Sequence, residues 1–317
     1  MRELYGHSKE TLVILHGGAG GQDPRSPRAL ATATDALRQI ALEASEMLRH
    51  GMHPQDVVVR ALEAMELDEQ FNAGKGSSLQ ADGQARLTAA LMNGETGTFS
   101  GVIGAMHLVH PSALAKHLQT QSARVLTSPG TELLARELGL PVSTPLTKER
   151  IEKWQKKFLD QVESCDTVGA LVRTASGALF AGTSTGGRGY EFPGRVSDSA
   201  TVAGTYASRF AAISATGVGE EIVDDALAAR LETRRRDGLS LESASTKCFA
   251  EANAKGRMYG WIAVDMEGFW GVAHTTPTMS FAVHGIDSGE IASSRGNGPL
   301  AHYDFLGSSP SRLSLRL

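Results

Sequence analysis

The sequence of 317 residues is poor in cysteine and in aromatic residues, which make up 6% of it. Its two cysteines, Cys165 and Cys248, cannot form the disulfide framework of a small secreted protein. No stretch approaches the roughly 18 apolar residues that a membrane helix needs. The first apolar run, residues 12–15, is too short for the core of a signal peptide. We therefore expect a reduced, cytoplasmic protein without a membrane segment.

The chain also lacks a large excess of positive or negative charge. The chain has 31 Lys and Arg against 35 Asp and Glu, a formal net charge of −4, and no long basic run. This balance argues against nucleic acid or an anionic membrane as the main partner. Hydrophobic residues make up 41% of the chain, enough for a folded core of one large domain or two ordinary ones.

Local sequence patterns predict mixed helices and strands. Helices are predicted over residues 30–48, from 54 onward, and over 148–160, 220–237 and 241–255. Strands are predicted over 12–15, 102–109, 166–172, 178–181, 260–265, 269–274 and 279–284, with a hairpin over 76–93 that turns at 81–83 and a loose tail in the last ten or so residues. The highly charged segment 148–160 is expected to lie on the surface. This order fits two sheets between layers of helices.

Two familiar motifs can be set aside. Residues 182–186 match the G-x-S-x-G pattern of serine hydrolases, which requires a helix directly after the serine. The glycine- and proline-rich continuation, residues 187–194, cannot form that helix. Three histidines, His107, His110 and His117, lack the i, i+4 spacing and the neighbouring glutamate of a metalloprotease. They are interpreted as ordinary surface or core histidines.

A set of glycine- and hydroxyl-rich segments remains in the second half of the chain. They contain Thr167, residues 183–187, residues 194–199 and residues 216–220. Serine, threonine and glycine are common in turns, so any one of these segments alone is explained by turn formation.

Six segments together resemble the plant-type asparaginase and isoaspartyl peptidase family of N-terminal-nucleophile hydrolases. They are collinear and correctly spaced: LVILHGGAG (12–20), FNAGKGSSLQADG (71–83), DTVGALV (166–172), AGTSTGG (181–187), PGRVSDS (193–199) and ATGVGE (215–220). The resemblance implies an α+β fold of four αββα layers, with residues 1–317 as a single domain. It also implies self-cleavage between Asp166 and Thr167, giving an α-chain of 1–166 and a β-chain of 167–317, and a homodimer of such αβ heterodimers.

The resemblance assigns the chemistry to four residues. Thr167 is implied to be the nucleophile, and its own α-amine, which the cut at Asp166 frees, is implied to be the base. A model α-amine has a pKa of about 7.7–8, so much of it is neutral near physiological pH. Thr185 matches the hydroxyl beside the nucleophile. The hydroxyl of Thr216 and the N–H of Gly217 match the oxyanion hole and also contact the substrate.

Substrate recognition is implied at the same site. Arg195 matches the residue that binds the α-carboxylate, a bidentate task that suits a guanidinium. Asp198, with the carbonyl of Gly219, matches the partner of the α-ammonium. Asn72 resembles a residue that holds the nucleophile in place. No organic cofactor is implied. A structural sodium ion would bind backbone carbonyls, those of Met65, Glu66, Asp68, Phe71, Ala73 and Lys75.

The sequence also departs from the family pattern. Thr88 stands where aspartate is usual, Ser197 replaces a usual glycine, and a lysine occupies position 75 of the sodium loop. Asp-Thr at the cut site also occurs in the aspartylglucosaminidase and taspase branches. Taspase, however, lacks the aspartate that matches Asp198, and the aspartylglucosaminidases lack the HGGAG start.

The preferred function is hydrolysis of β-aspartyl dipeptides, with L-asparagine as a second substrate. Two alternatives stay open: a taspase-like threonine endopeptidase, and a non-catalytic relative that is never cleaved.

Overall fold

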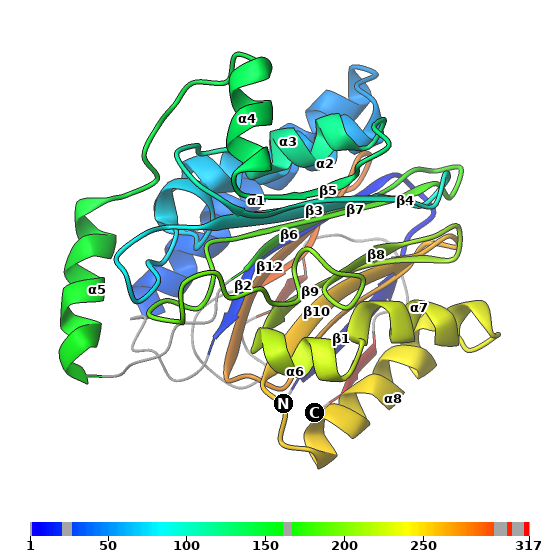
Figure 1. Ribbon diagram of the computed structural model, residues 1–317. Helices are drawn as coiled ribbons and strands as arrows, with labels where there is room; N and C mark the ends of the chain where they lie inside the picture. The colour runs from blue at the N-terminus through cyan, green and yellow to red at the C-terminus, as the bar shows by residue number, and fades with distance from the viewer. Residues whose placement is uncertain (1, 21–26, 161–166, 295–302, 306–313, 317) are drawn as a thin grey trace.

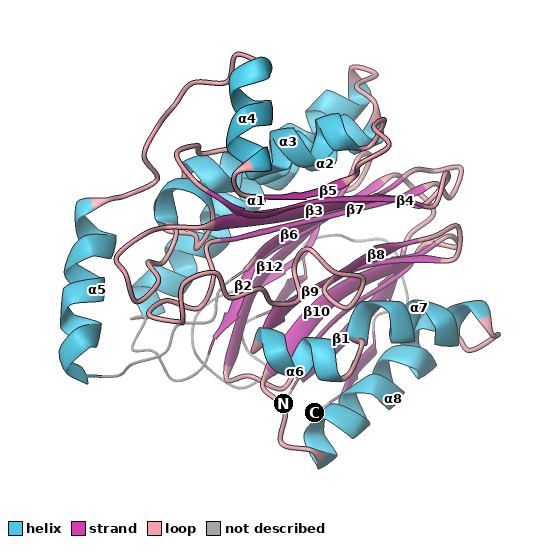
Figure 2. Cartoon of the chain, viewed as in Figure 1, coloured by secondary structure: helices cyan, strands magenta, loops and turns pink. Residues whose placement is uncertain are grey.

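The computed structural model describes residues 2–20, 27–160, 167–294, 303–305 and 314–316. Within these ranges, two β-sheets pack face to face, and most helices lie on their outer faces (Figure 1; Figure 2). The predicted class of mixed helices and sheets, α+β, is confirmed. None of the described helices combines the length and the apolarity that a membrane span requires.

The larger sheet has nine strands among the described residues. Their order is β14 (Tyr303–Phe305), β13 (Gly289–Ser294), β12 (Thr278–Gly285), β2 (Leu12–Gly20), β6 (Val168–Arg173), β7 (Leu179–Thr185), β3 (Leu87–Asn93), β4 (Thr98–Ala105) and β5 (Val125–Thr127). All neighbours are antiparallel except β4 and β5. Strand β6, which begins directly after Thr167, is therefore central and fully buried.

The smaller sheet has six strands in the described part of the chain. Their order is β15 (Ser314–Arg316), β1 (Arg2–His7), β11 (Phe269–His274), β10 (Tyr259–Asp265), β9 (Ala211–Gly217) and β8 (Thr205–Ala207), all antiparallel. Strand β9 ends on Thr216 and Gly217, so this sheet contributes two of the predicted site residues.

Helices cover the outer face of each sheet (Figure 1). On the larger sheet lie α1 (Pro27–Arg49), α2 (Pro54–Leu67) and α3 (Pro111–Leu118); on the smaller lie α6 (Gly219–Asp224), α7 (Leu227–Arg236) and α8 (Leu241–Ala254). A 3-10 turn spans Gly74–Gly76, and α4 (Gly130–Glu137) lies beside β4 and β5. The charged α5 (Lys148–Asp160) stands at one side, as its composition predicts, and the Trp154 indole donates to the carbonyl of Gln80 (2.9 Å).

The alternation of side chains along β2 and β6 explains how the layers are held together. In β2, Val13 and Leu15 join the core under the helices, whereas Leu12 and Ile14 join the core between the sheets. Both faces are buried, so the strand reads as a continuous apolar run. In β6, Leu171 faces the other sheet. Alternation with period two gives residues 167 and 169 the same direction.

Three of the predicted secondary-structure elements differ from the structure. No hairpin spans 76–93: β3 pairs with β4 and β7 instead. The segment before β3 bonds to the loop after β7, through Tyr190 N to Leu79 O (2.6 Å) and Ala81 N to Glu191 O (2.9 Å), so it forms no ladder of its own. The strand predicted over 102–109 is β4, which ends at 105. The helix predicted over 220–237 splits into α6 and α7 at Ala226, whose φ is +45°.

Several strands were not predicted. Strand β1 lies in the polar N-terminal segment, β8 and β9 are rich in alanine and small polar residues, and β14 and β15 are only three residues each. The loose tail is contradicted at Ser314–Arg316, which pair with β1; most of the tail lies outside the described residues.

Candidate active site

The side chain of Thr167 lies buried at the start of β6. Its hydroxyl donates to the hydroxyl of Thr185 at 3.2 Å. The antiparallel pairing of β6 and β7 sets Val168 opposite Ser184, so the start of one strand meets the end of the other. The N–H of Gly187 also donates to the Thr185 hydroxyl (3.1 Å). Strand register therefore brings the two predicted threonines together.

Thr216 approaches Thr167 from the other sheet. Its hydroxyl oxygen accepts from the backbone nitrogen of Thr167 (3.3 Å) and from that of Ala19 (3.1 Å), in the glycine-rich segment that follows residues 12–15. Gly217 follows, with φ at +132°, and a Cβ there would lie 2.5 Å from the Cα of Tyr259. Only glycine fits at 217, so its backbone can adopt this conformation beside Thr216.

Asn72 supports the loop behind Thr185. Its amide nitrogen donates to the carbonyl of Gly187 (2.6 Å), and its own carbonyl accepts from Gly186 N (2.9 Å). Its side-chain oxygen accepts from Ser78 N (2.8 Å). Asn72 therefore holds the glycine turn that contacts Thr185, which is an indirect support of the nucleophile.

The residues predicted to bind the head group of the substrate, Arg195, Asp198 and Gly219, also lie close together. Gly219 is so close to Asp198 that a Cβ at 219 would lie 2.7 Å from its Oδ1. Asp198 is 2% exposed, and its Oδ2 has no hydrogen-bond partner among the described residues. Burial raises the pKa of Asp198 to about 7, and the positive charge of Arg195 opposes the rise. A buried carboxylate with one oxygen left unpartnered is suited to receive a cation.

Arg195 already has a partner within the protein. Its Nε and Nη2 donate to the two carboxylate oxygens of Glu220, at 2.6 and 2.7 Å. A second guanidinium, that of Arg188, lies 4.0 Å from the same carboxylate. Sequence reasoning missed Glu220 and Arg188, although Glu220 belongs to the ATGVGE segment and its charge complements Arg195.

His16 is another residue that sequence reasoning missed as part of the site. It is fully buried, and its Nε2 lies 2.9 Å from the Ser214 hydroxyl on β9. A Cβ at Gly169 would lie 2.1 Å from that hydroxyl and 2.2 Å from His16 Nε2, so the pair lies directly against the nucleophile strand. Burial lowers the pKa of His16 to about 3. An imidazole with so low a pKa takes up a proton too weakly near pH 7 to be a good candidate for the base.

The contact between His16 and Ser214 belongs to a longer chain of hydroxyl groups between the two sheets. The Ser214 hydroxyl lies 2.8 Å from that of Thr183, Thr205 donates to Thr183 (2.6 Å), and Thr205 also contacts the carbonyl of Ser199 (2.9 Å). This buried chain links His16 to the residue after Asp198.

Ser184, the serine of the G-x-S-x-G match, points to the opposite side. Its hydroxyl donates to the carboxylate of Glu66 (2.7 Å), which is fully buried and also accepts from the Ser112 hydroxyl (2.8 Å). His110 lies 3.2 Å from the same carboxylate. Among the described residues, no group of three or more His, Cys, Asp or Glu is arranged for a metal ion. Because its hydroxyl is bonded to the buried Glu66, Ser184 has a structural contact and does not face Thr167.

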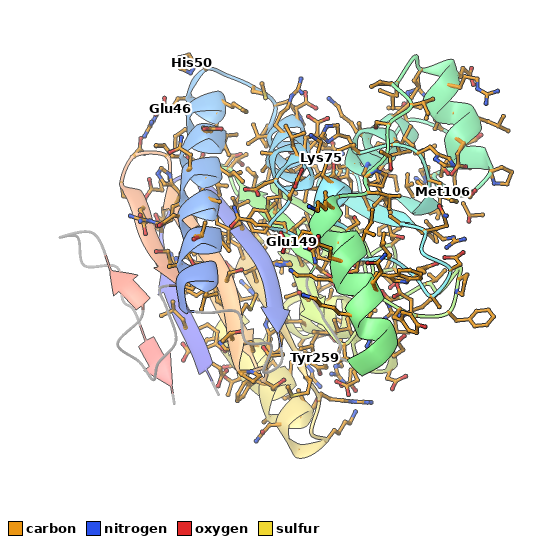
Figure 3. All side chains as sticks on the ribbon, turned by 90° about the vertical axis from the view of Figure 1, so that its left-hand side faces the viewer. Glu46, His50, Lys75, Met106, Glu149 and Tyr259 are labelled. Atoms are coloured by element: carbon orange, nitrogen blue, oxygen red, sulfur yellow. The ribbon has the colours of Figure 1, made fainter. Side chains whose placement is uncertain are left out.

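The loop predicted to hold sodium is folded back on itself. Three of its six carbonyls accept one hydrogen bond each: Asp68 O from Phe71 N (3.2 Å), Ala73 O from Gly76 N (3.0 Å), and Phe71 O from Arg150 Nη2 (3.4 Å). A carbonyl oxygen has two lone pairs, so these groups fit a monovalent ion as well. Arg150 nevertheless brings a positive charge beside the loop. Figure 3 shows α5, with Glu149 on it, and Lys75 on the neighbouring loop.

The departures from the family pattern have ordinary contacts. Thr88 stands opposite Thr185 in the β3–β7 pairing, and its hydroxyl accepts from Gly104 N (3.2 Å). The Ser197 hydroxyl lies 3.3 Å from Asp198 Oδ1. Asp166, on the other side of the predicted cut, lies outside the described residues.

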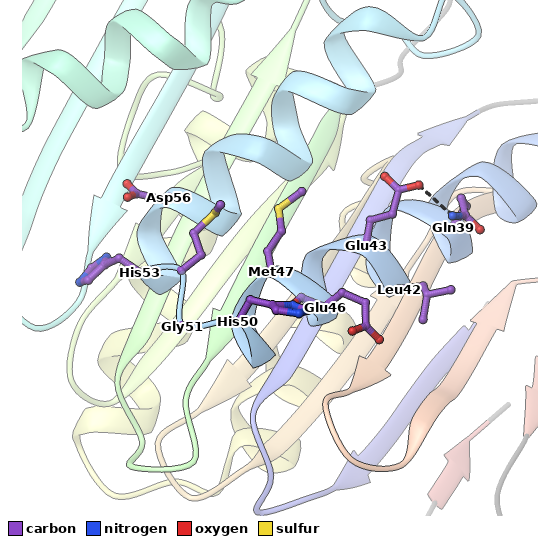
Figure 4. Close-up of a pocket in the computed structure, with 10 residues that line it drawn as sticks. Gln39, Leu42, Glu43, Glu46, Met47, His50, Gly51, His53 and Asp56 are labelled. Carbon is purple, nitrogen blue, oxygen red and sulfur yellow. Dashed lines mark hydrogen bonds between the residues drawn. The ribbon is translucent and has the colours of Figure 1, made fainter.

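A surface groove is separate from this cluster. It lies where α1 ends and α2 begins, and it is lined by residues between Gln39 and Asp56 (Figure 4). Its acidic side chains come from the two helices and its histidines, His50 and His53, from the connection between them. None of the predicted site residues lines it.

A threonine hydroxyl can attack a carbonyl carbon when a neighbouring base takes its proton, and the amine of an N-terminal threonine is such a base. A family model described as asparaginase matches residues 9–292, and the chain belongs to this asparaginase family. It is 40% identical over 288 residues to an isoaspartyl peptidase/L-asparaginase of Synechocystis, covering 86% of this chain and 87% of the relative. It is also 33% identical to an isoaspartyl peptidase of Salmonella typhimurium (85% and 97% covered) and 32% identical to a plant-type L-asparaginase of Pyrococcus horikoshii (85% and 95%).

Proposed function

We propose that the protein is a self-processing amidohydrolase that cleaves β-aspartyl dipeptides and the side-chain amide of L-asparagine. The observation that carries the proposal is the cluster around Thr167, whose hydroxyl and nitrogen contact Thr185 and Thr216 at 3.2 and 3.3 Å. The two packed sheets with outer helices support an αββα N-terminal-nucleophile fold, as a single domain over 1–317.

Activation requires a free amine on Thr167. Its hydroxyl attacks the carbonyl carbon of residue 166, and the peptide nitrogen leaves to give an ester and an amine. Water then hydrolyses the ester, so a carboxylate ends the chain 1–166 and Thr167 begins the chain 167–317. In the uncut chain the peptide nitrogen of Thr167 donates its N–H to Thr216. If the amine keeps this contact after the cut, its lone pair stays available to take the proton of the Thr167 hydroxyl. His16 is neutral and is not needed as the base.

Catalysis repeats this chemistry on the substrate. The Thr167 oxygen attacks the side-chain carbonyl carbon while the amine of Thr167 takes the hydroxyl proton. The C–N bond of the amide then breaks, and the ammonium of Thr167 returns that proton to the leaving ammonia or amino acid. Water then cleaves the β-aspartyl ester and restores the hydroxyl. Thr216 and Gly217 stabilise the oxyanion, and each such donor is worth about 2.7–4 kcal/mol in the transition state.

Recognition depends on a free amino-acid head group. Arg195 binds the α-carboxylate with the N–H groups that Glu220 does not use, and Asp198 with Gly219 O binds the α-ammonium. The unpartnered Oδ2 of Asp198 supports this assignment. An internal aspartyl residue has no α-ammonium, so it would leave the buried carboxylate of Asp198 without a cation, whereas Arg195 keeps its ion pair with Glu220. A buried charge without its partner costs about 3–5 kcal/mol. This cost disfavours a taspase-like endopeptidase.

Three further points belong to the proposal. The processed protein forms a homodimer of αβ heterodimers in the cytoplasm, and neither nucleic acid nor a membrane is a partner. It needs no organic cofactor. A sodium ion binds the carbonyls between Met65 and Lys75 and stabilises the loop that carries Asn72.

The test compares four compounds with the purified protein: β-Asp-Leu, L-asparagine, α-Asp-Leu, and an N-acetylated, C-amidated aspartyl peptide. We expect turnover of the first two only, with the blocked peptide at least about 100-fold slower, which corresponds to the cost of an unpaired buried charge. Comparable turnover of the blocked peptide would favour the endopeptidase. An intact, inactive chain would favour the non-catalytic relative.

A further inference from the structure

The loop that carries Arg195 is held by a segment on the other side of the predicted cut. Two backbone hydrogen bonds join residues 79–81 to residues 190–191, at 2.6 and 2.9 Å. A third contact comes from a side chain, because the N–H of Gly194 donates to Oε1 of Gln80 (2.8 Å). The backbone immediately before Arg195 is therefore held by a residue of the predicted α-chain.

Gly194 has little else to restrain its backbone. Its φ is +87°, and a Cβ added there would meet no neighbouring atom within 4 Å. Glycine also has more backbone freedom than any other residue. A turn follows, in which Arg195 N donates to Phe192 O (3.0 Å). The bond from Gly194 to Gln80 thus sets where the side chain of Arg195 begins, and Glu220 holds the guanidinium at its far end.

Gln80 is itself held from several sides. It is 2% exposed, and its Oε1 also accepts from Arg86 Nη1 (2.8 Å). Its N–H donates to the carbonyl of Gln84 (2.9 Å), and its own carbonyl accepts from the indole of Trp154 (2.9 Å). Buried polar groups whose hydrogen bonds are made form rigid networks. Gln80 is therefore a fixed acceptor for Gly194.

Trp154 lies on α5, the last described element before the predicted cut (Figure 1). Besides its bond to Gln80, its ring lies against both loops. The ring centroid is 6.3 Å from that of Tyr190, and a Cβ at Gly83 would lie 3.5 Å from the indole. The helix before the cut therefore contacts both of the loops that meet at Gly194.

We propose that Gln80 and Trp154 are positioning residues for substrate recognition: through Gly194 they hold the guanidinium of Arg195 where it meets the α-carboxylate. This inference rests on the proposed function, because Arg195 must bind that carboxylate. It divides recognition between the two chains of the processed protein, since residues of the chain 1–166 set the position of an arginine in the chain 167–317. Neither residue has a part in self-cleavage, which needs no α-carboxylate.

The test measures kcat and KM for β-Asp-Leu and for an analogue in which the α-carboxylate is replaced by a carboxamide. Gln80→Met removes the acceptor at nearly the same size. A neutral hydrogen bond is worth about 2- to 13-fold. We expect this variant to raise KM for β-Asp-Leu by about fivefold and to change kcat by less than about twofold. Its kcat/KM for the carboxamide should equal that of the wild type, because an analogue without the carboxylate gains little from the position of the guanidinium.

Three variants serve as comparisons. Gln80→Glu keeps an acceptor for Gly194 and should retain most of the wild-type KM. Trp154→Phe removes the indole donor but keeps an aromatic ring, and it should raise KM for β-Asp-Leu by at least about twofold. Gln119→Met is the matched control: this carboxamide is also bound, to Ser100 Oγ at 2.9 Å, but at the end of α3 on the outer face of the larger sheet. It should keep the wild-type KM.

All variants should cleave themselves completely, which reports that they fold. An unchanged KM for β-Asp-Leu in Gln80→Met would overturn the inference. An equal loss on both substrates would also overturn it, because Gln80 would then be structural. Both results leave the proposed function intact. If Gln80→Met does not self-cleave, Trp154→Phe decides the inference by the same two results. A processed wild type that does not distinguish the carboxylate from the carboxamide would instead refute the role of Arg195 in the proposed function, and this inference with it.

Discussion

Replacing Asp198 by asparagine should stabilise the protein at alkaline pH while it abolishes activity. The carboxyl is 2% exposed, and burial raises its pKa from the ordinary 3.8 to about 7. At about 1.4 kcal/mol per pKa unit, the ionised form destabilises the fold by about 4 kcal/mol above pH 7. An amide nitrogen left unpaired at the position of Oδ2 costs about 1–3 kcal/mol. We therefore expect a net gain of about 2 kcal/mol at pH 8.

The sign of the pH dependence follows from proton binding. Between about pH 4 and pH 7 the folded protein holds a proton on Asp198 that the unfolded chain has released, so this group lowers stability as the pH rises through that window. Below pH 4 both states are protonated. The advantage of asparagine should therefore be large at pH 8 and disappear near pH 4.

The assay is thermal unfolding of uncleaved chains, Thr167→Ala and Thr167→Ala/Asp198→Asn, at pH 4.5 and pH 8. For a chain of 317 residues, a gain of about 2 kcal/mol corresponds to about 3 °C in Tm. Asp225→Asn is the matched control, because that buried aspartate is paired with Lys255 at 2.5 Å and the same change should lower Tm at pH 8. An equal or lower Tm for Asp198→Asn at pH 8 would show that Asp198 has a partner and would refute the reasoning.

Three further outcomes are expected. Arg195→Ala should abolish hydrolysis of β-aspartyl dipeptides but leave self-cleavage largely intact, since cleavage needs no α-carboxylate. A denaturing gel and an activity assay on the same sample check this. Equal loss of self-cleavage and hydrolysis would mark Arg195 as structural. The kcat/KM for L-asparagine should fall by up to about tenfold per pH unit below the pKa of Asp198, about 7, because the neutral carboxyl no longer attracts the substrate ammonium; a flat profile from pH 5 to 7 would contradict this. Replacing Na⁺ by choline at equal ionic strength should lower Tm by about 2–4 °C, and an unchanged Tm would indicate that Arg150 alone supplies the positive charge at the loop.

Long periodic segments were predictable from the sequence, because burial of a whole face leaves a clear pattern. Helices α1 and α8 and the strands β6, β10, β11 and β12 lie close to their predicted ranges, whereas β2, predicted over 12–15, continues through the glycine-rich segment to Gly20. The hairpin over 76–93 failed because residues before β3 bond to the loop after β7, a long-range contact that no local pattern encodes. The break between α6 and α7 depends on one alanine with positive φ, which propensity does not reveal.

The residues of the candidate site also fall into those that the sequence indicated and those that it did not. Thr167, Thr185 and Thr216 were named from short motifs, and strand register brings them together. His16 and Glu220 were missed, although both belong to the quoted segments, because their roles depend on partners 198 and 25 residues away in the chain. Nothing in the local sequence indicates that Arg195 pairs with Glu220 or that His16 is held neutral by burial.

The central claim is that Thr167 becomes an N-terminal nucleophile, and intact mass with N-terminal sequencing tests it most directly. The purified wild type should separate into two pieces that begin at Met1 and Thr167, and the second should hydrolyse β-Asp-Leu only together with the first. Thr167→Ala should remain one chain of about 33.6 kDa. A wild type that stays at that mass yet turns over β-Asp-Leu would contradict the account, because the Thr167 nitrogen would then still be an amide and could not act as the base.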